Sequence, residues 1–169
     1  YKFFPISETL KKNDYVYKNF VSQENGEIVY VDDGQVVHSL KGIDVSRHQG
    51  KIDWKKVAAD GVSYAFIRVG FRGSTEGKLV EDEYFKDNIE GALDNNINVG
   101  IYFYTQAITE EEAVEEADFV IDLIKKYDVT YPVVLDIEET GSSTARTAQM
   151  SQEDYTKATI AFCERIKEA

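Results

Sequence analysis

The sequence predicts an α/β protein in which parallel strands alternate with helices. From Gly42 onward, short apolar runs recur four times, and each is followed by a segment whose apolar residues have helical spacing. Alternation of this kind is typical of parallel strands joined by crossover helices. The first forty residues lack this pattern, so we expect them to form a separate appendage. The expected strands cover 42–45, 64–69, 99–104 and 133–137.

The composition describes a globular protein with little affinity for nucleic acid. The chain has 169 residues, of which 43% are apolar and 30% are charged, which is unlike a disordered chain. Its 19 basic and 31 acidic residues give a net charge of -12, which repels polyphosphates. No run of about 18 apolar residues is present, so we expect no transmembrane segment. No signal-peptide pattern opens the chain, so an export signal would lie upstream of residue 1.

Residues 1–40 end in a hairpin signal. Alternating apolar residues in 27–31 and 35–40 flank Asp32-Asp33-Gly34, and an Asp-Gly pair between two such runs is typical of a tight β-turn. The preceding 25 residues are aromatic and polar without a clear period. We therefore predict an appendage over 1–40 that contains a small β-hairpin, and a main domain over 41–169.

Four helices are expected, one after each strand. The third begins at Thr109 and the fourth at Ser151, because each is followed three residues later by an acidic residue in a capping-box pattern. Acidic residues from Glu110 to Glu116 complement the dipole at the start of the third helix, so we interpret this run as a solvated helix face and not as a metal site. The apolar faces consist of Trp54, Val57 and Ala58; Phe85, Ile89, Ala92 and Leu93; Ala113, Ala117, Val120, Ile121 and Ile124; and Tyr155, Ala158, Phe162 and Ile166.

Cysteine and histidine are too sparse for a disulfide or a metal site. Cys163 is the single cysteine, and its helical spacing beside Phe162 and Ile166 predicts a thiol packed in the core. His38 and His48 have no Cys or His partner at metal-ligand spacing. We interpret both histidines as structural and predict no metal and no cofactor.

Two carboxylates follow the last apolar strand. In Tyr131-Pro132-Val133-Val134-Leu135-Asp136-Ile137-Glu138, the acids Asp136 and Glu138 are two residues apart and share one face of a strand, about 6 to 7 Å apart along the rise. Acids at the end of an apolar strand are partly desolvated, and two like charges at one place separate in their titrations. One acid then keeps its proton while its neighbour is ionised, and a protonated and an ionised carboxyl group are the pair that a glycosidase uses. Solvated acids at a surface strand end are the structural alternative.

Other chemically active residues are expected at the same edge of the sheet, because function in parallel α/β proteins gathers at the carboxyl ends of the strands. Asp44 lies near the end of the first strand and Arg68 late in the second. Tyr102 and Tyr104 share one face of the third strand, where they either stack on a sugar or pack in the core. Arg68 either binds a substrate carboxylate or pairs with a carboxylate of the protein.

The sequence resembles the glycoside hydrolase family 25 lysozymes, the Chalaropsis-type muramidases, over residues 42–169. Several separately placed motifs occur in the family's order, which makes the resemblance specific. They are Gly42-Ile43-Asp44-Val45-Ser46, Gln49-Gly50, Ile52-Asp53-Trp54, Gly61-Val62, Ala65-Phe66-Ile67-Arg68-Val69-Gly70, Asn88, Ala92, Val99-Gly100-Ile101-Tyr102-Phe103-Tyr104 and Pro132-Val133-Val134-Leu135-Asp136-Ile137-Glu138.

This resemblance implies a modified β/α barrel, similar to a TIM barrel, that cleaves peptidoglycan between N-acetylmuramic acid and N-acetylglucosamine. It implies Glu138 as the general acid, Asp136 as the adjacent carboxylate and Asp44 as a supporting acid, with glycan strands as the partner and the cell wall or the cell exterior as the location. It leaves open whether Asp136 stabilises the transition state or orients the substrate's N-acetyl group, and hence the stereochemistry. A carbohydrate-binding relative without turnover and a chitin-type hydrolase are the alternatives.

The family's barrel continues beyond the four strand and helix units of this sequence. We therefore expect an incomplete barrel, whose missing half lies in a longer polypeptide or in a second chain. A sheet of four such units would expose two edges, which folded proteins normally avoid.

Overall fold

The computed structural model describes Thr9, residues 14–37 and residues 39–169. It divides into two compact units, Tyr1–Ser39 and Leu40–Ala169. His38, interpreted above as structural, lies outside the described residues.

The first unit contains a three-stranded antiparallel sheet in the order β1-β2-β3, where the sequence predicts a hairpin. Asp33 and Gly34 connect β2 to β3 with φ values of 46° and 76°, the left-handed backbone that a two-residue hairpin turn requires. The strand β1 is unpredicted, because its three residues are too few to show a period. The elements are η1 (Tyr17–Asn19), β1 (Phe20–Ser22), β2 (Ile28–Asp32) and β3 (Gln35–Val37).

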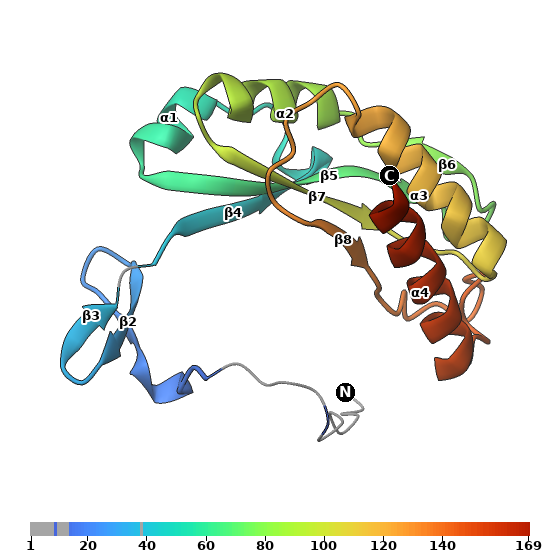
Figure 1. Ribbon diagram of the computed structural model, residues 1–169, viewed down its shortest axis with the longest axis horizontal. Helices are drawn as coiled ribbons and strands as arrows, with labels where there is room; N and C mark the ends of the chain where they lie inside the picture. Colours follow the sequence, from blue (N-terminus) through green and yellow to red (C-terminus); the bar gives the residue numbers. More distant parts are fainter. Residues whose placement is uncertain (1–8, 10–13, 38) are drawn as a thin grey trace. The chain divides into compact units, whose positions relative to one another are not determined.

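The second unit contains a mostly parallel sheet, as predicted, and its strands lie in the order β4-β5-β7-β8 (Figure 1). The short strand β6 pairs antiparallel with the last three residues of β5, which runs past the predicted end at Val69 to Arg72. Neither feature has a sequence signal, because β6 is short and β5 shifts its register between Arg68 and Gly70. The strands are β4 (Lys41–Val45), β5 (Val62–Arg72), β6 (Leu79–Glu81), β7 (Asn98–Tyr104) and β8 (Val133–Asp136).

The four predicted helices are present, and the third and fourth start at their predicted caps. Thr109 accepts a hydrogen bond from the backbone N–H of Glu112, and Ser151 forms a full capping box with Asp154. In Figure 1, α3 and α4 lie side by side, in agreement with their contacts. The bounds are η2 (Arg47–Gln49), α1 (Trp54–Ala59), α2 (Phe85–Asp94), α3 (Glu110–Ile124) and α4 (Gln152–Glu168).

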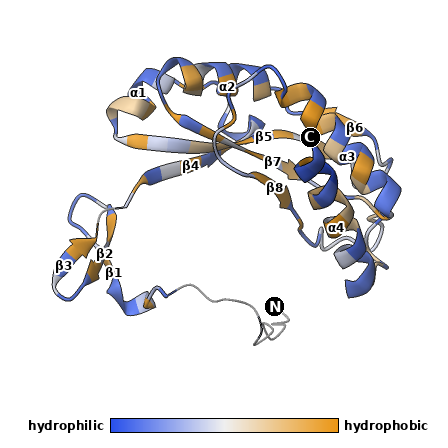
Figure 2. Ribbon diagram, viewed as in Figure 1, coloured by the Kyte–Doolittle hydropathy of each residue, from blue (hydrophilic) through white to orange (hydrophobic). Residues whose placement is uncertain are grey.

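All four helices contribute to one apolar core on one face of the sheet. Figure 2 shows hydrophobic and hydrophilic residues alternating along α2, α3 and α4, as expected of helices with one buried side. Fully buried side chains alternate along the two central strands and contact apolar residues of the helices. On β5 and β7 these are Ala65, Ile67, Val69, Val99, Ile101 and Phe103.

The opposite face of the sheet carries aromatic and charged side chains that are only half-buried. Tyr64 stacks on Tyr131 with ring centroids 5.2 Å apart, and Phe66 meets the Tyr131 ring edge-on at 6.3 Å. Tyr102 and Tyr104 lie on this same face, because they share a strand face with Gly100, the register partner of Phe66 on β5. This face therefore supplies an aromatic floor that leads to the carboxyl ends of the strands.

The prediction that Cys163 packs in the core is wrong. Phe162 is buried and Ile166 is half-buried, as expected, but the thiol of Cys163 is exposed. Successive helix residues are rotated by about 100°, so the residue after Phe162 lies to the side of the buried apolar face.

No helix among the described residues is long and apolar enough to cross a membrane.

Candidate active site

A cavity of about 610 Å³ opens at the carboxyl ends of the parallel strands, and all six predicted site residues line it. Four strands supply them, because parallel strands bring their carboxyl ends to one edge of the sheet. Asp44 comes from β4, Arg68 from β5, Tyr102 and Tyr104 from β7, Asp136 from the last position of β8, and Glu138 from two residues farther on.

The paired acids differ in their surroundings. Asp136 is half-buried and its carbonyl oxygen accepts a hydrogen bond from the Thr105 N–H at 3.0 Å, whereas Glu138 lies past the strand and is exposed. Desolvation raises the pKa of the Asp136 carboxyl, with further increases from the charges of Glu138 and Asp44, while the Arg68 guanidinium lowers it. Arg68 is therefore the group that favours an ionised Asp136 in this cavity.

This raised pKa predicts that Asp136 destabilises the folded protein at neutral pH. The folded state binds the Asp136 proton more tightly than the unfolded chain does, so this residue favours folding in acid and the benefit is lost as pH rises through the folded pKa. Asp136→Asn should therefore raise Tm at pH 7, and the gain should shrink to nothing below the unfolded pKa of about 3.9. Thermal unfolding between pH 3 and 7 measures this, with Asp128→Asn as the control at an exposed carboxylate outside the cavity. A lower Tm for Asp136→Asn at pH 7 would contradict the expected direction.

Arg68 pairs with a carboxylate of the protein, Asp82, which is one of the two roles expected for it from the sequence. Its Nε donates to Oδ2 of Asp82 at 2.8 Å, and one terminal nitrogen lies 2.7 Å from the same oxygen. The Asp82 carboxylate is fully buried and also accepts hydrogen bonds from the backbone N–H groups of Arg47 and Tyr84. Sequence reasoning missed Asp82. An acid close before a helix was the available signal, but many exposed acids share it.

The two tyrosines keep their hydroxyl protons at neutral pH. Desolvation raises the pKa of Tyr102, partly offset by a hydrogen bond with Ser46, and it also raises the pKa of Tyr104, with a further increase from Glu138. Gln106, which is buried, donates from Nε2 to the Tyr104 hydroxyl oxygen at 3.3 Å. Both phenols can therefore donate a hydrogen bond to a carboxylate or to a sugar oxygen.

The short helix η2 forms the rim of the cavity next to β4. Ser46 caps it: its Oγ accepts from the His48 N–H at 3.3 Å, and its own N–H donates to Oε1 of Gln49 at 2.8 Å. The side chains of Arg47 and His48 are exposed and line the cavity. His48, expected to be structural, thus lies at the candidate site. No group of three or more His, Cys, Asp or Glu side chains among the described residues could hold a metal ion.

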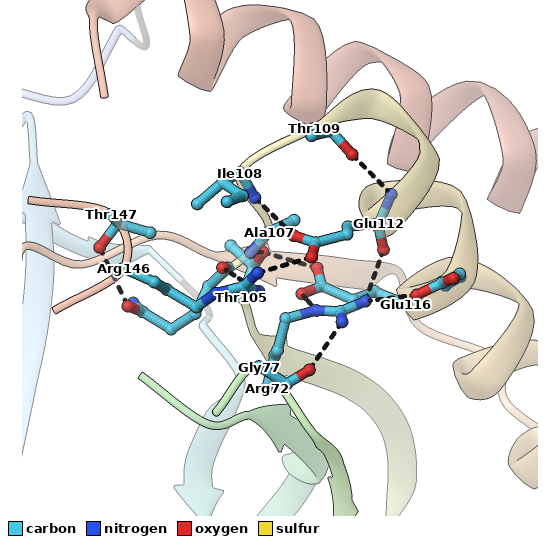
Figure 3. Close-up of polar contacts among 12 residues, drawn as sticks. Arg72, Gly77, Thr105, Ala107, Ile108, Thr109, Glu112, Glu116, Arg146 and Thr147 are labelled. Carbon is cyan, nitrogen blue, oxygen red and sulfur yellow. Dashed lines mark hydrogen bonds and ion pairs between the residues drawn. The ribbon is translucent and has the colours of Figure 1, made fainter. Parts of the chain in front are cut away.

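A buried ion pair between Arg72, which lines the cavity, and Glu116 corrects the prediction that 110–116 is a solvated helix face. Glu116 is completely buried and accepts hydrogen bonds from Arg72 Nε at 2.8 Å and from the Thr105 hydroxyl at 2.6 Å (Figure 3). Burial raises the pKa of Glu116 against these hydrogen bonds, which lower it. The residue faces the sheet because it lies three positions after Ala113 and next to Ala117, both buried. The burial of Glu116 could have been predicted only from its partner Arg72 on β5, and the two residues are 44 positions apart in the sequence.

A second arginine ties α3 to the segment between β8 and α4. Arg146 donates to the Gln106 carbonyl at 3.1 Å and pairs with Oε1 of Glu112 at 2.6 Å (Figure 3). Thr147 donates to Oε1 of Gln106 at 3.0 Å. Since Gln106 also holds the Tyr104 hydroxyl, these contacts connect the helical layer to the wall of the cavity.

Comparison with known proteins agrees with this geometry. Residues 43–169 match the family described as "Glycosyl hydrolases family 25". The uncharacterized protein YegX of Escherichia coli K12 is 31% identical over 109 residues, 64% of this chain and 39% of that protein. The autolytic lysozyme of Clostridium acetobutylicum is 29% identical over 101 residues, 60% of this chain and 29% of that protein. The modular autolysin LytC of Streptococcus pneumoniae, solved with a synthetic peptidoglycan ligand, has a TM-score of 0.70 and 28% identity over 89% of this chain and 35% of that chain.

The chain spans two fifths or less of the length of these three relatives. The family match nevertheless covers most of its residues, including all six predicted site residues. The chain therefore belongs to glycosyl hydrolase family 25.

Proposed function

We propose that the protein containing this chain is an N-acetylmuramidase that cleaves the β-1,4 bond between N-acetylmuramic acid and N-acetylglucosamine in peptidoglycan. The observation that carries the proposal is the convergence of Asp44, Asp136 and Glu138 on one cavity with Tyr102 and Tyr104 in its wall. Glycoside hydrolysis uses paired carboxylates, and aromatic rings stack on sugars. The family match and the lysozyme among the relatives support the same activity.

In this proposal Glu138 protonates the leaving glycosidic oxygen and later activates water. Its exposed position past the end of β8 allows it to reach the scissile bond. Asp136, ionised with the help of Arg68, stabilises the oxocarbenium-like transition state or orients the N-acetyl group of the substrate. Asp44 lies on β4, at the other end of the strand order from β8, and adds negative charge to the cavity. The two tyrosines position the sugar rings.

We further propose that the unit Leu40–Ala169 is part of a β/α barrel, with the unit Tyr1–Ser39 as an appendage to it. Among the described residues, β4 and β8 each pair with a single neighbouring strand, which leaves an edge on both sides of the sheet. Barrel closure removes such edges. The remaining strands would come from a longer polypeptide or a second chain, and the assembled enzyme would act on glycan strands at the cell wall or outside the cell.

The products of digestion test the proposed function against its alternatives. The full-length protein should release fragments from purified peptidoglycan whose new reducing ends are N-acetylmuramic acid, identified by mass spectrometry after borohydride reduction. Reducing ends of N-acetylglucosamine would indicate a different bond, and release from chitin alone would indicate a chitin-type hydrolase. Saccharide binding by calorimetry without any released reducing ends would indicate a carbohydrate-binding relative.

A further inference from the structure

One arginine of the cavity has no acidic partner among the described residues. Three arginines line the cavity, and two of them are neutralised: Arg68 by Asp82, and Arg72 by Glu116 and Glu115. Across the described ranges, the guanidinium of the third, Arg47, forms neither a hydrogen bond nor an ion pair with another side chain. It lies over the ring of Phe71, with Cζ 5.3 Å from the ring centroid.

The Arg47 side chain is nevertheless restrained both at its backbone and at its guanidinium. The backbone N–H of Arg47 donates to Oδ2 of the buried Asp82 at 3.1 Å, and the capping box of Ser46 and Gln49 holds the turn of η2. The contact with Phe71 restrains the other end of the side chain. Restraint before binding lowers the entropy lost when a ligand is bound, so five N–H donors are presented to the cavity at low cost.

The charge of the cavity indicates what these donors meet. Asp44, Asp136 and Glu138 repel an anionic ligand, so a substrate that carries a carboxylate needs a compensating cation at the place where the carboxylate lies. The guanidinium matches a carboxylate through two parallel hydrogen bonds. Of the two sugars in peptidoglycan, the muramic acid carries a lactyl carboxyl, which is either free or linked to a stem peptide that itself ends in carboxylates.

We propose that Arg47 is a specificity-determining residue that binds a substrate carboxylate, either the free muramyl lactyl group or a carboxylate of the stem peptide. This inference rests on the proposed function and adds the chemical feature of the substrate that the site selects. Arg47 favours muramic-acid glycans over neutral N-acetylglucosamine polymers, and it takes no part in the bond cleavage.

Binding to matched ligands tests this inference. In full-length protein carrying Glu138→Gln to prevent turnover, Kd is measured by calorimetry for three glycans: one with free lactyl acids, its lactyl methyl ester, and one with stem peptides. Arg47→Gln should weaken binding of at least one carboxylate ligand by about tenfold or more, as expected for a charge-assisted pair, and change binding of the ester by less than about twofold. Loss with the free acid identifies the lactyl group. Loss restricted to the peptide-bearing glycan, and absent once its carboxylates are amidated, identifies the stem peptide.

Two further variants separate a direct contact from general electrostatics. Lys51→Gln removes an equal charge four residues away, from an exposed side chain that does not line the cavity, and should leave all three affinities unchanged. Arg47→Lys keeps the charge but loses the two-pronged geometry, so it should recover part of the loss. An equal effect of Arg47→Gln on acid and ester, or no effect on any ligand, would overturn the inference while leaving the muramidase proposal intact. Failure of the Glu138→Gln protein to bind any of the glycans would overturn both.

Discussion

Replacing Glu138 with Gln is expected to abolish the clearing of a cell-wall suspension. Glutamine occupies nearly the same volume but has no proton to give to the leaving oxygen, and loss of a general acid typically lowers a rate by about a hundred- to ten-thousandfold. Turbidity of purified peptidoglycan, followed over time at matched concentrations of full-length protein, measures the effect. Thermal unfolding should be nearly unchanged, because the Glu138 side chain is exposed.

The neighbouring acid provides a matched control. Glu139 is exposed like Glu138, but it lines a different cavity, on the segment that leads to α4. Glu139→Gln removes the same charge one residue away, so its clearing rate should stay within about twofold of the unsubstituted protein, as expected for surface electrostatics that salt screens. Clearing by Glu138→Gln at the unsubstituted rate would exclude Glu138 as the general acid and, with it, the assignment of roles proposed for the site.

The largest effect on stability is expected from Arg72→Met. This change leaves the fully buried Glu116 carboxylate without its cation, and it also removes donors to the carbonyl oxygens of Gly77 and Glu112. Removing one partner of a buried ion pair typically costs about 3–5 kcal/mol of unfolding free energy. Denaturant unfolding measures the loss, which should shrink in acid because protonation of Glu116 removes the unpaired charge.

Two comparisons show whether the unpaired charge is the cause. Lys157→Met breaks the exposed pair with Glu153, whose side chains are 53% and 75% exposed, and should cost about 0.5 kcal/mol or less. Arg72→Met combined with Glu116→Met should recover much of the stability, because replacing both partners with apolar groups of similar size is often close to neutral. If Arg72→Met unfolds at the same denaturant concentration as the unsubstituted protein, the buried pair does not stabilise this fold.

The sequence alone was enough to predict the parallel strands, the helices and the acids that line the cavity. Strand and helix periods are local patterns, and caps such as Thr109 and Ser151 depend on residues only three positions apart. The convergence of Asp44 with Asp136 follows from one topological rule, that the carboxyl ends of parallel strands share an edge. These features needed no knowledge of which side chains touch.

The tertiary structure alone decided which charges are paired. Arg68 and Asp82 are 14 residues apart, and Arg72 and Glu116 are 44 residues apart, so no local period connects them. Within the acidic run of α3, burial separates Glu116 from its solvated neighbours only because β5 brings Arg72 against that position. The sequence states which side chains are ionisable, but their desolvation and their partners depend on packing between distant elements. The sequence alone predicted that Asp136 and Glu138 share one site, whereas the structure was needed to show that Arg47 beside them has no carboxylate partner among the described residues.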